Sequence, residues 1–140
     1  MPETAVATSL TDKLTASREA ARALATATTA QKNTALRAIA DAVLRNQARV
    51  LQANELDLAN GRDNGLSAGL QDRLRLDEKR LIALSQAVLE IVALPDPVGD
   101  VVRGSSLENG LQLTQIRVPF GVVGAIYEAR PNVTVDIAAI

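Results

Sequence analysis

The sequence predicts an α/β chain in which a helical amino-terminal part precedes a β-hairpin and the first strand of a parallel sheet. In residues 1–97, apolar side chains recur at the three- and four-residue spacing of amphipathic helices. After Pro97 the spacing changes to two, which is typical of strands. Residues 121–127, GVVGAIY, are apolar throughout and therefore indicate a strand buried on both faces, as in a parallel sheet.

Two helices are expected before residue 46. Ser9 and Asp12, three residues apart, form the pattern of a capping box, so the first helix is predicted to begin there. It is predicted to end at a threonine-rich break over residues 26–29. The second helix has a continuous apolar stripe that consists of Leu36, Ile39, Ala40, Val43 and Leu44.

Three further helices are expected between residues 47 and 94. The first covers residues 47–60 and ends at Gly61, because Asn-Gly pairs are typical of loops. Ser67 and Asp77 are good N-cap residues for the other two helices. The last helix is stopped by a Pro-Asp-Pro run, since proline cannot donate to the helix ladder. Its buried face is predicted to consist of Leu81, Leu84, Val88, Ile91 and Val92.

A β-hairpin is expected over residues 98–118. Its two candidate strands, residues 98–106 and 111–117, flank the dipeptide Asn109-Gly110. An Asn-Gly pair predicts a two-residue type I′ turn, in which both central residues have positive φ.

The segment after the apolar strand is the expected ligand-binding region. Residues 128–131 form the loop at the carboxyl end of this strand, which is where open α/β sheets bind ligands. Asn132 is a good cap for the helix that follows. Residues 137–140, IAAI, contain no helix-stop signal, so we expect this chain to be a fragment of a longer protein.

Composition and charge exclude several classes of function. The 15 basic and 16 acidic residues give a net charge of −1, so neither nucleic acid nor a membrane surface is an expected partner. Residues 1–4 lack the pattern of a secretory signal, and a cytoplasmic location is expected. The chain has no Cys and no His, which leaves no disulfide framework and no expected metal site.

One segment resembles a known family. Residues 117–136 read RVPFGVVGAIYEARPNVTVD, and this run resembles the signature of the glutamate-5-semialdehyde dehydrogenases (γ-glutamyl phosphate reductases). Other segments agree with the same family, namely residues 53–58, 65–67, 72–76, 94–99 and 109–111. The resemblance covers nearly the whole chain after residue 30.

The resemblance implies the fold of the aldehyde dehydrogenase superfamily. Residues 1–97 would be the helical part of its nucleotide-binding domain, and residues 98–118 the β-hairpin of an oligomerisation arm. Residues 119–140 would be the first strand, loop and helix of the nucleotide-binding sheet. The catalytic domain would lie outside this chain, and the full-length protein would be a homo-oligomer.

The resemblance also implies a reaction in proline biosynthesis. Members of the family use NADPH to reduce the small molecule L-glutamyl 5-phosphate to L-glutamate 5-semialdehyde and phosphate. A cysteine thiolate attacks the acyl phosphate, and these 140 residues contain no cysteine. We therefore expect the fragment alone to be inactive, with the nucleophile and the determinants of NADPH selectivity beyond Ile140.

Asn132 is the expected catalytic residue, because a side-chain amide can donate to the oxygen of a tetrahedral intermediate. The resemblance is imperfect here. The wider superfamily has its oxyanion Asn after a Pro-Trp pair that this chain lacks, and a gapless overlay puts Arg130 at that position. The alternative interpretation of Asn132 is a helix N-cap alone.

Arg130 is the expected substrate-binding residue, because a guanidinium suits carboxylate and phosphate groups. Its alternative is a salt bridge with Glu128 or Asp136. Ile126 and Tyr127 are expected to line the nicotinamide side of the cofactor cleft, and their alternative is a place in the core.

Two other functions fit the same sequence. The first is another aldehyde dehydrogenase, for example a CoA-acylating enzyme, which dependence of the activity on phosphate would exclude. The second is a non-catalytic helical interaction module, in which the apolar carboxyl-terminal residues would bind a partner.

Overall fold

The computed structural model describes residues 9–140, which belong to two compact units. One unit consists of Thr29–Pro95 and Ala125–Ile140, and the other of Met1–Thr28 and Asp96–Gly124. The expectation about a secretory signal at residues 1–4 lies outside the described residues. Within the described part of the chain, no helix combines the length and the apolar character needed to cross a bilayer.

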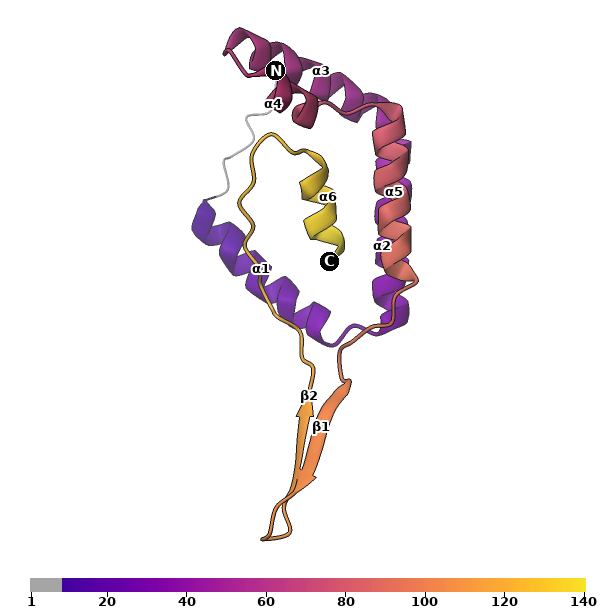
Figure 1. The fold of residues 1–140 in the computed structure, drawn as a ribbon, viewed down its shortest axis with the longest axis vertical. Coiled ribbons are helices and arrows are strands. Elements are labelled where there is room, and N and C mark those ends of the chain that lie inside the picture. The colour runs from indigo at the N-terminus through magenta and orange to yellow at the C-terminus, as the bar shows by residue number, and fades with distance from the viewer. Residues whose placement is uncertain (1–8) are drawn as a thin grey trace. The chain divides into compact units, whose positions relative to one another are not determined.

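The regular secondary structure of the first unit is all helical (Figure 1). The helices are α2 (Thr29–Arg45), α3 (Gln47–Asp63), α4 (Ala68–Leu74), α5 (Glu78–Val92) and α6 (Asn132–Ala139). Helix α2 packs along α5. Helix α6, although it is distant in sequence, also packs on α5. Helices α3 and α4 contact each other.

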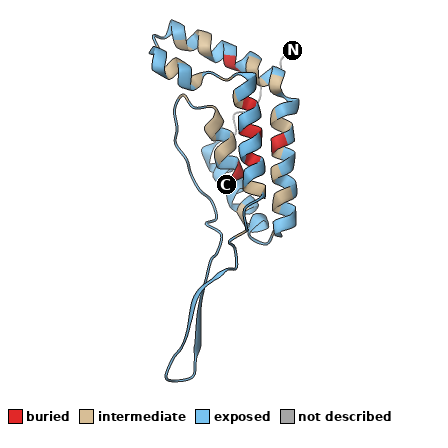
Figure 2. Cartoon of the chain, turned by 45° about the vertical axis from the view of Figure 1, so that its right-hand side comes forward, coloured by how far each residue is buried: buried red, intermediate tan, exposed pale blue. Residues whose placement is uncertain are grey.

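The core of this unit lies where α2, α5 and α6 meet. Ala40, Val88 and Ala139, one from each helix, are buried against one another. Small alanines on α2 and α6 allow these helices to approach α5 closely. Figure 2 shows that most buried residues lie on α5. Four partly buried side chains surround the cluster: Leu36, Ile39, Ile91 and Val135.

Most local predictions for the helices are confirmed. Ser9 and Asp12 form the capping box of α1 (Leu10–Ala25), which ends before Thr26. The side chain of Ser67 accepts from the Leu70 N–H at the start of α4, and that of Asp77 accepts from the Arg80 N–H at the start of α5.

The expected end of α3 at Gly61 is wrong, because the helix continues to Asp63. A Cβ atom on Gly61 would lie 3.2 Å from Cδ2 of Leu66. The glycine therefore permits close packing of the Leu66 side chain against the helix. This tertiary requirement outweighs the modest helix-breaking tendency of a single glycine.

Asn54 joins α3 to the connection between α4 and α5. The residue is 4% exposed. Its Nδ2 donates to the Leu74 carbonyl at 2.8 Å, and its Oδ1 accepts from the Leu76 N–H at 2.7 Å. One buried amide thus supplies hydrogen-bond partners to two backbone groups that lie outside the regular hydrogen bonding of the helices.

Replacing Asn54 with alanine is expected to destabilise this connection by about 1–3 kcal/mol, because both backbone groups lose their partner. The measurement is hydrogen exchange of the Leu76 amide in the full-length protein, which should become faster. Gln52→Ala is the matched control, since Gln52 is exposed on the same helix. Equal exchange rates in the two variants would contradict the role of Asn54.

The second unit contains α1 and a hairpin. Strands β1 (Val101–Ser106) and β2 (Gln112–Ile116) pair antiparallel, with Ser106 opposite Gln112. The predicted hairpin is confirmed, but the predicted type I′ turn is wrong. Only Gly110 in this loop has positive φ, at 84°, and its N–H donates to the Leu107 carbonyl at 2.9 Å. The loop therefore has three residues, 108–110, and ends in a left-handed glycine.

The strand expected over residues 121–127 is not formed in this structure. Residues 117–131 contain neither helix nor strand. A strand requires a neighbour that satisfies its N–H and C=O groups. Among residues 9–140, the only sheet is the two-stranded hairpin, so this apolar segment has no strand to pair with.

Candidate functional site

The expected site residues lie at the start of α6 and in the turn before it. Ala129 has a φ of 49°, the left-handed region that residues other than glycine rarely adopt. Residues 128 and 129 form a bend, and the Val133 N–H donates to the Arg130 carbonyl at 3.1 Å. Backbone strain of this kind costs about 1–3 kcal/mol and occurs often at functional sites.

Helix α6 is fixed to the core by one of its faces. Val135 and Ala139, four residues apart, pack against the cluster around Val88 of α5. Asn132 and Asp136 have the same spacing and lie beside this buried stripe, and both are half-buried. This packing fixes the backbone of α6 at Asn132 and Asp136, while the side chains of both residues remain partly accessible to solvent.

The interpretation of Asn132 as the N-cap of α6 is wrong. The N-cap residue is Pro131, and no side chain caps the helix. Asn132 is instead the first helical residue, and its Nδ2 donates to Oδ2 of Asp136 at 2.9 Å. An amide nitrogen carries two hydrogens, so this contact leaves the second one to bind another acceptor.

The alternative interpretation of Arg130 as a salt-bridge residue is also wrong for this structure. Within residues 9–140, its guanidinium makes no ion pair, and the side chain is exposed. Asp136, one of its two expected partners, binds Asn132 instead. The guanidinium is therefore available for an anionic ligand.

Ile126 and Tyr127 are exposed, so neither has the core position that was their alternative. The Tyr127 hydroxyl and the Thr134 hydroxyl share a hydrogen bond of 2.6 Å. This bond connects the segment before the turn to the first turns of α6. Thr134 could not be predicted from the sequence, because a hydroxyl pair seven residues apart has no recognisable pattern.

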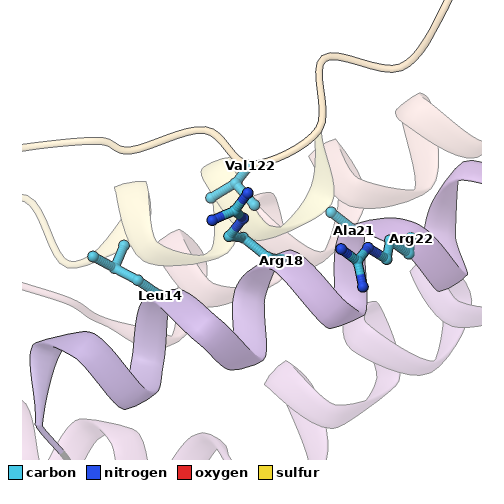
Figure 3. Close-up of a pocket in the computed structure, with 5 residues that line it drawn as sticks. All are labelled: Leu14, Arg18, Ala21, Arg22 and Val122. Atoms are coloured by element: carbon cyan, nitrogen blue, oxygen red, sulfur yellow. The ribbon is translucent and has the colours of Figure 1, made fainter.

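An open pocket of about 530 Å³ lies in the other unit (Figure 3). Its lining consists of Leu14, Arg18, Ala21, Arg22 and Val122. Figure 3 shows four of these side chains on α1, with Val122 facing them from residues 117–131. None of the expected site residues lines this pocket, so it does not coincide with the candidate site. In the described part of the chain, no group of three or more acidic side chains is arranged to hold a metal ion.

Solved structures share the fold of this chain. A crystal structure of gamma-glutamyl phosphate reductase from Thermotoga maritima matches with a TM-score of 0.87 and 39% identity, over 93% of this chain and 31% of that one. The corresponding structure from Saccharomyces cerevisiae matches with a TM-score of 0.85 and 32% identity, over 94% and 34% of the two chains. Both are reductases, so this chain has the fold of part of a reductase.

Curated relatives agree with the structural match. A gamma-glutamyl phosphate reductase from Leifsonia xyli subsp. xyli is 63% identical over 140 residues, which is 100% of this chain and 33% of that protein. One from Clavibacter michiganensis subsp. michiganensis is 59% identical over 127 residues, 91% of this chain and 29% of that protein. No protein-family model matches the chain.

The chain is therefore homologous, over its whole length, to part of gamma-glutamyl phosphate reductase. It spans about one third of the length of the curated relatives it matches. This coverage agrees with the expectation that the chain is a fragment of a longer protein.

Proposed function

We propose that the full-length protein reduces L-glutamyl 5-phosphate to L-glutamate 5-semialdehyde and phosphate in proline biosynthesis, with NADPH as the reductant. The similarity to reductases over the entire chain supports this reaction. The observation that carries it at the site is the pair of groups at the start of α6. Arg130 has no ionic partner among the described residues, and Asn132 has an amide hydrogen without a partner.

These two groups suit a substrate that is already anionic and whose acyl oxygen gains negative charge during the reaction. In this proposal the Arg130 guanidinium binds the carboxylate or the phosphate of the substrate, because its planar donors match both groups. The second amide hydrogen of Asn132 donates to the substrate oxygen that becomes negative when a thiolate adds to the acyl carbon. The thiolate itself comes from outside these 140 residues, which contain no cysteine.

Ile126 and Tyr127 are proposed to contact the nicotinamide part of the cofactor. Their exposed positions fit this role, since both offer apolar surface that an aromatic ring would cover. The hydrogen bond from Tyr127 to Thr134 restrains the ring of Tyr127 beside α6. When bound, the cofactor supplies the hydride that the reduction requires.

The domain organisation forms part of the same proposal. Residues 1–97 and 119–140 belong to a nucleotide-binding domain, and residues 121–127 become a strand there when neighbouring strands pair with them. Residues 98–118 form an arm that joins subunits of a homo-oligomer. Every residue of β1 and β2 is exposed. Because an isolated two-stranded hairpin is marginally stable in water, this exposure supports the proposal that another subunit covers the hairpin. We also propose a cytoplasmic location.

The test is the reverse reaction of the full-length protein. We expect reduction of NADP⁺ with L-glutamate 5-semialdehyde only when inorganic phosphate is present, because phosphate must capture the acyl group. Omission of phosphate and its replacement with CoA are the two controls. Activity with CoA alone would indicate a CoA-acylating aldehyde dehydrogenase, and absence of activity in every mixture would refute the proposed reaction.

A further inference from the structure

Asn132 and Asp136 form a pair whose geometry defines the orientation of the amide. Asp136 lies one turn after Asn132 on α6, and the two side chains meet at 2.9 Å. A carboxylate has no hydrogen to donate, so it binds only the NH₂ end of an amide. The contact therefore determines which end of the Asn132 amide faces Asp136.

This restraint matters because the helix alone does not provide it. Packing of Val135 and Ala139 on the core fixes the backbone of α6. The terminal torsion of asparagine is nevertheless broad, so the amide of an unrestrained Asn132 can present either its oxygen or its nitrogen. An amide oxygen turned toward a developing oxyanion would repel it, whereas an N–H stabilises it.

We propose that Asp136 is a positioning residue for Asn132, an inference that rests on the proposed reductase function. Asp136 holds one amide hydrogen and thereby directs the other toward the substrate oxygen. The effect acts on the transition state, in which the oxygen is charged. Loss of Asp136 therefore lowers kcat and leaves KM for the semialdehyde nearly unchanged.

The experiment is a double-mutant cycle in the full-length protein, with phosphate-dependent NADP⁺ reduction as the assay. Asp136→Ala is expected to lower kcat about 10-fold in the wild-type background, since misplaced catalytic groups have effects of this order or larger. In the Asn132→Ala background the same change is expected to alter kcat less than about 2-fold, because Asp136 acts through Asn132. Asp136→Asn retains an acceptor oxygen and is expected to stay within about 3-fold of wild type.

The matched control is Asp41→Ala. Asp41 also pairs with a residue four positions away, Arg45, at 3.7 Å, but it lies exposed on α2. This variant should retain wild-type kcat. An equal loss of kcat from Asp136→Ala in both backgrounds would overturn the positioning role and indicate a structural one.

A second readout does not depend on activity. The side-chain amide protons of Asn132 should exchange with water faster in Asp136→Ala than in wild type, as measured by NMR with labelled asparagine. Unchanged exchange would overturn the inference even in a fully active enzyme. A wild-type protein with slow exchange and no phosphate-dependent activity would instead refute the proposed function alone.

Discussion

Replacing Asn132 with alanine in the full-length protein is expected to lower kcat about 100-fold or more, the effect typical of losing one oxyanion donor. The expectation rests on three features of the site. The residue begins a helix that is fixed to the core, it does not cap that helix, and its amide has a hydrogen left over from its bond to Asp136. Because the donor acts on a charge that appears only in the transition state, kcat should fall much more than KM rises.

The measurement is steady-state NADP⁺ reduction at saturating semialdehyde and phosphate. Asn46→Ala is a suitable control, since Asn46 also donates its side-chain amide to a group four residues away, at 2.8 Å, but lies exposed between α2 and α3. A loss smaller than about 3-fold in Asn132→Ala would contradict the oxyanion role, whose usual scale is far larger. Arg130 would then be the remaining candidate, as the superfamily overlay suggests.

The second large effect concerns stability. Leu81 on α5 is 1% exposed, and its truncation to alanine removes buried surface and leaves a cavity. We expect a loss of about 2–5 kcal/mol in the local stability of α5, the range found for such truncations. The chain spans only about one third of the length of its curated relatives. Because proteins with several domains rarely unfold in one two-state step, a single free energy of unfolding is not a suitable measure for the full-length protein. Native-state hydrogen exchange of the α5 amides is therefore the appropriate measurement.

Ile82, the next residue on α5, provides the control because it is 51% exposed. Ile82→Ala should change the exchange free energies of α5 by no more than about 0.5 kcal/mol. Similar losses in the two variants would mean that the buried face of α5 is not the one that this structure shows.

The helices and their caps could be predicted because their causes are local. The capping box at Ser9 depends on a residue three positions later, and the caps at Ser67 and Asp77 depend on backbone N–H groups three positions later. The buried face of α5 follows from apolar spacing within a single helix. Leu81, Leu84 and Val88 are buried as predicted, whereas Ile91 and Val92 are half-buried.

The candidate site was predictable in location but not in detail. The resemblance of residues 127–136 to a known signature indicated Arg130 and Asn132, yet their expected structural partners were wrong. The four-residue spacing of Asn132 and Asp136 was a usable signal for their contact, because such pairs face each other on a helix. The preference of Asn for N-cap positions favoured the wrong interpretation.

The sequence by itself determined where the helices and the hairpin lie, because each depends on residues a few positions apart. Only the tertiary structure decided why α3 passes through Gly61, how Asn54 serves the connection between α4 and α5, and that α6 packs on α5. These three features depend on close packing or on contacts between residues that are distant in the sequence, and a local sequence pattern contains no information about either. For the same reason residues 121–127, whose pattern indicates a strand, form none here: a strand exists only with a neighbour to pair with.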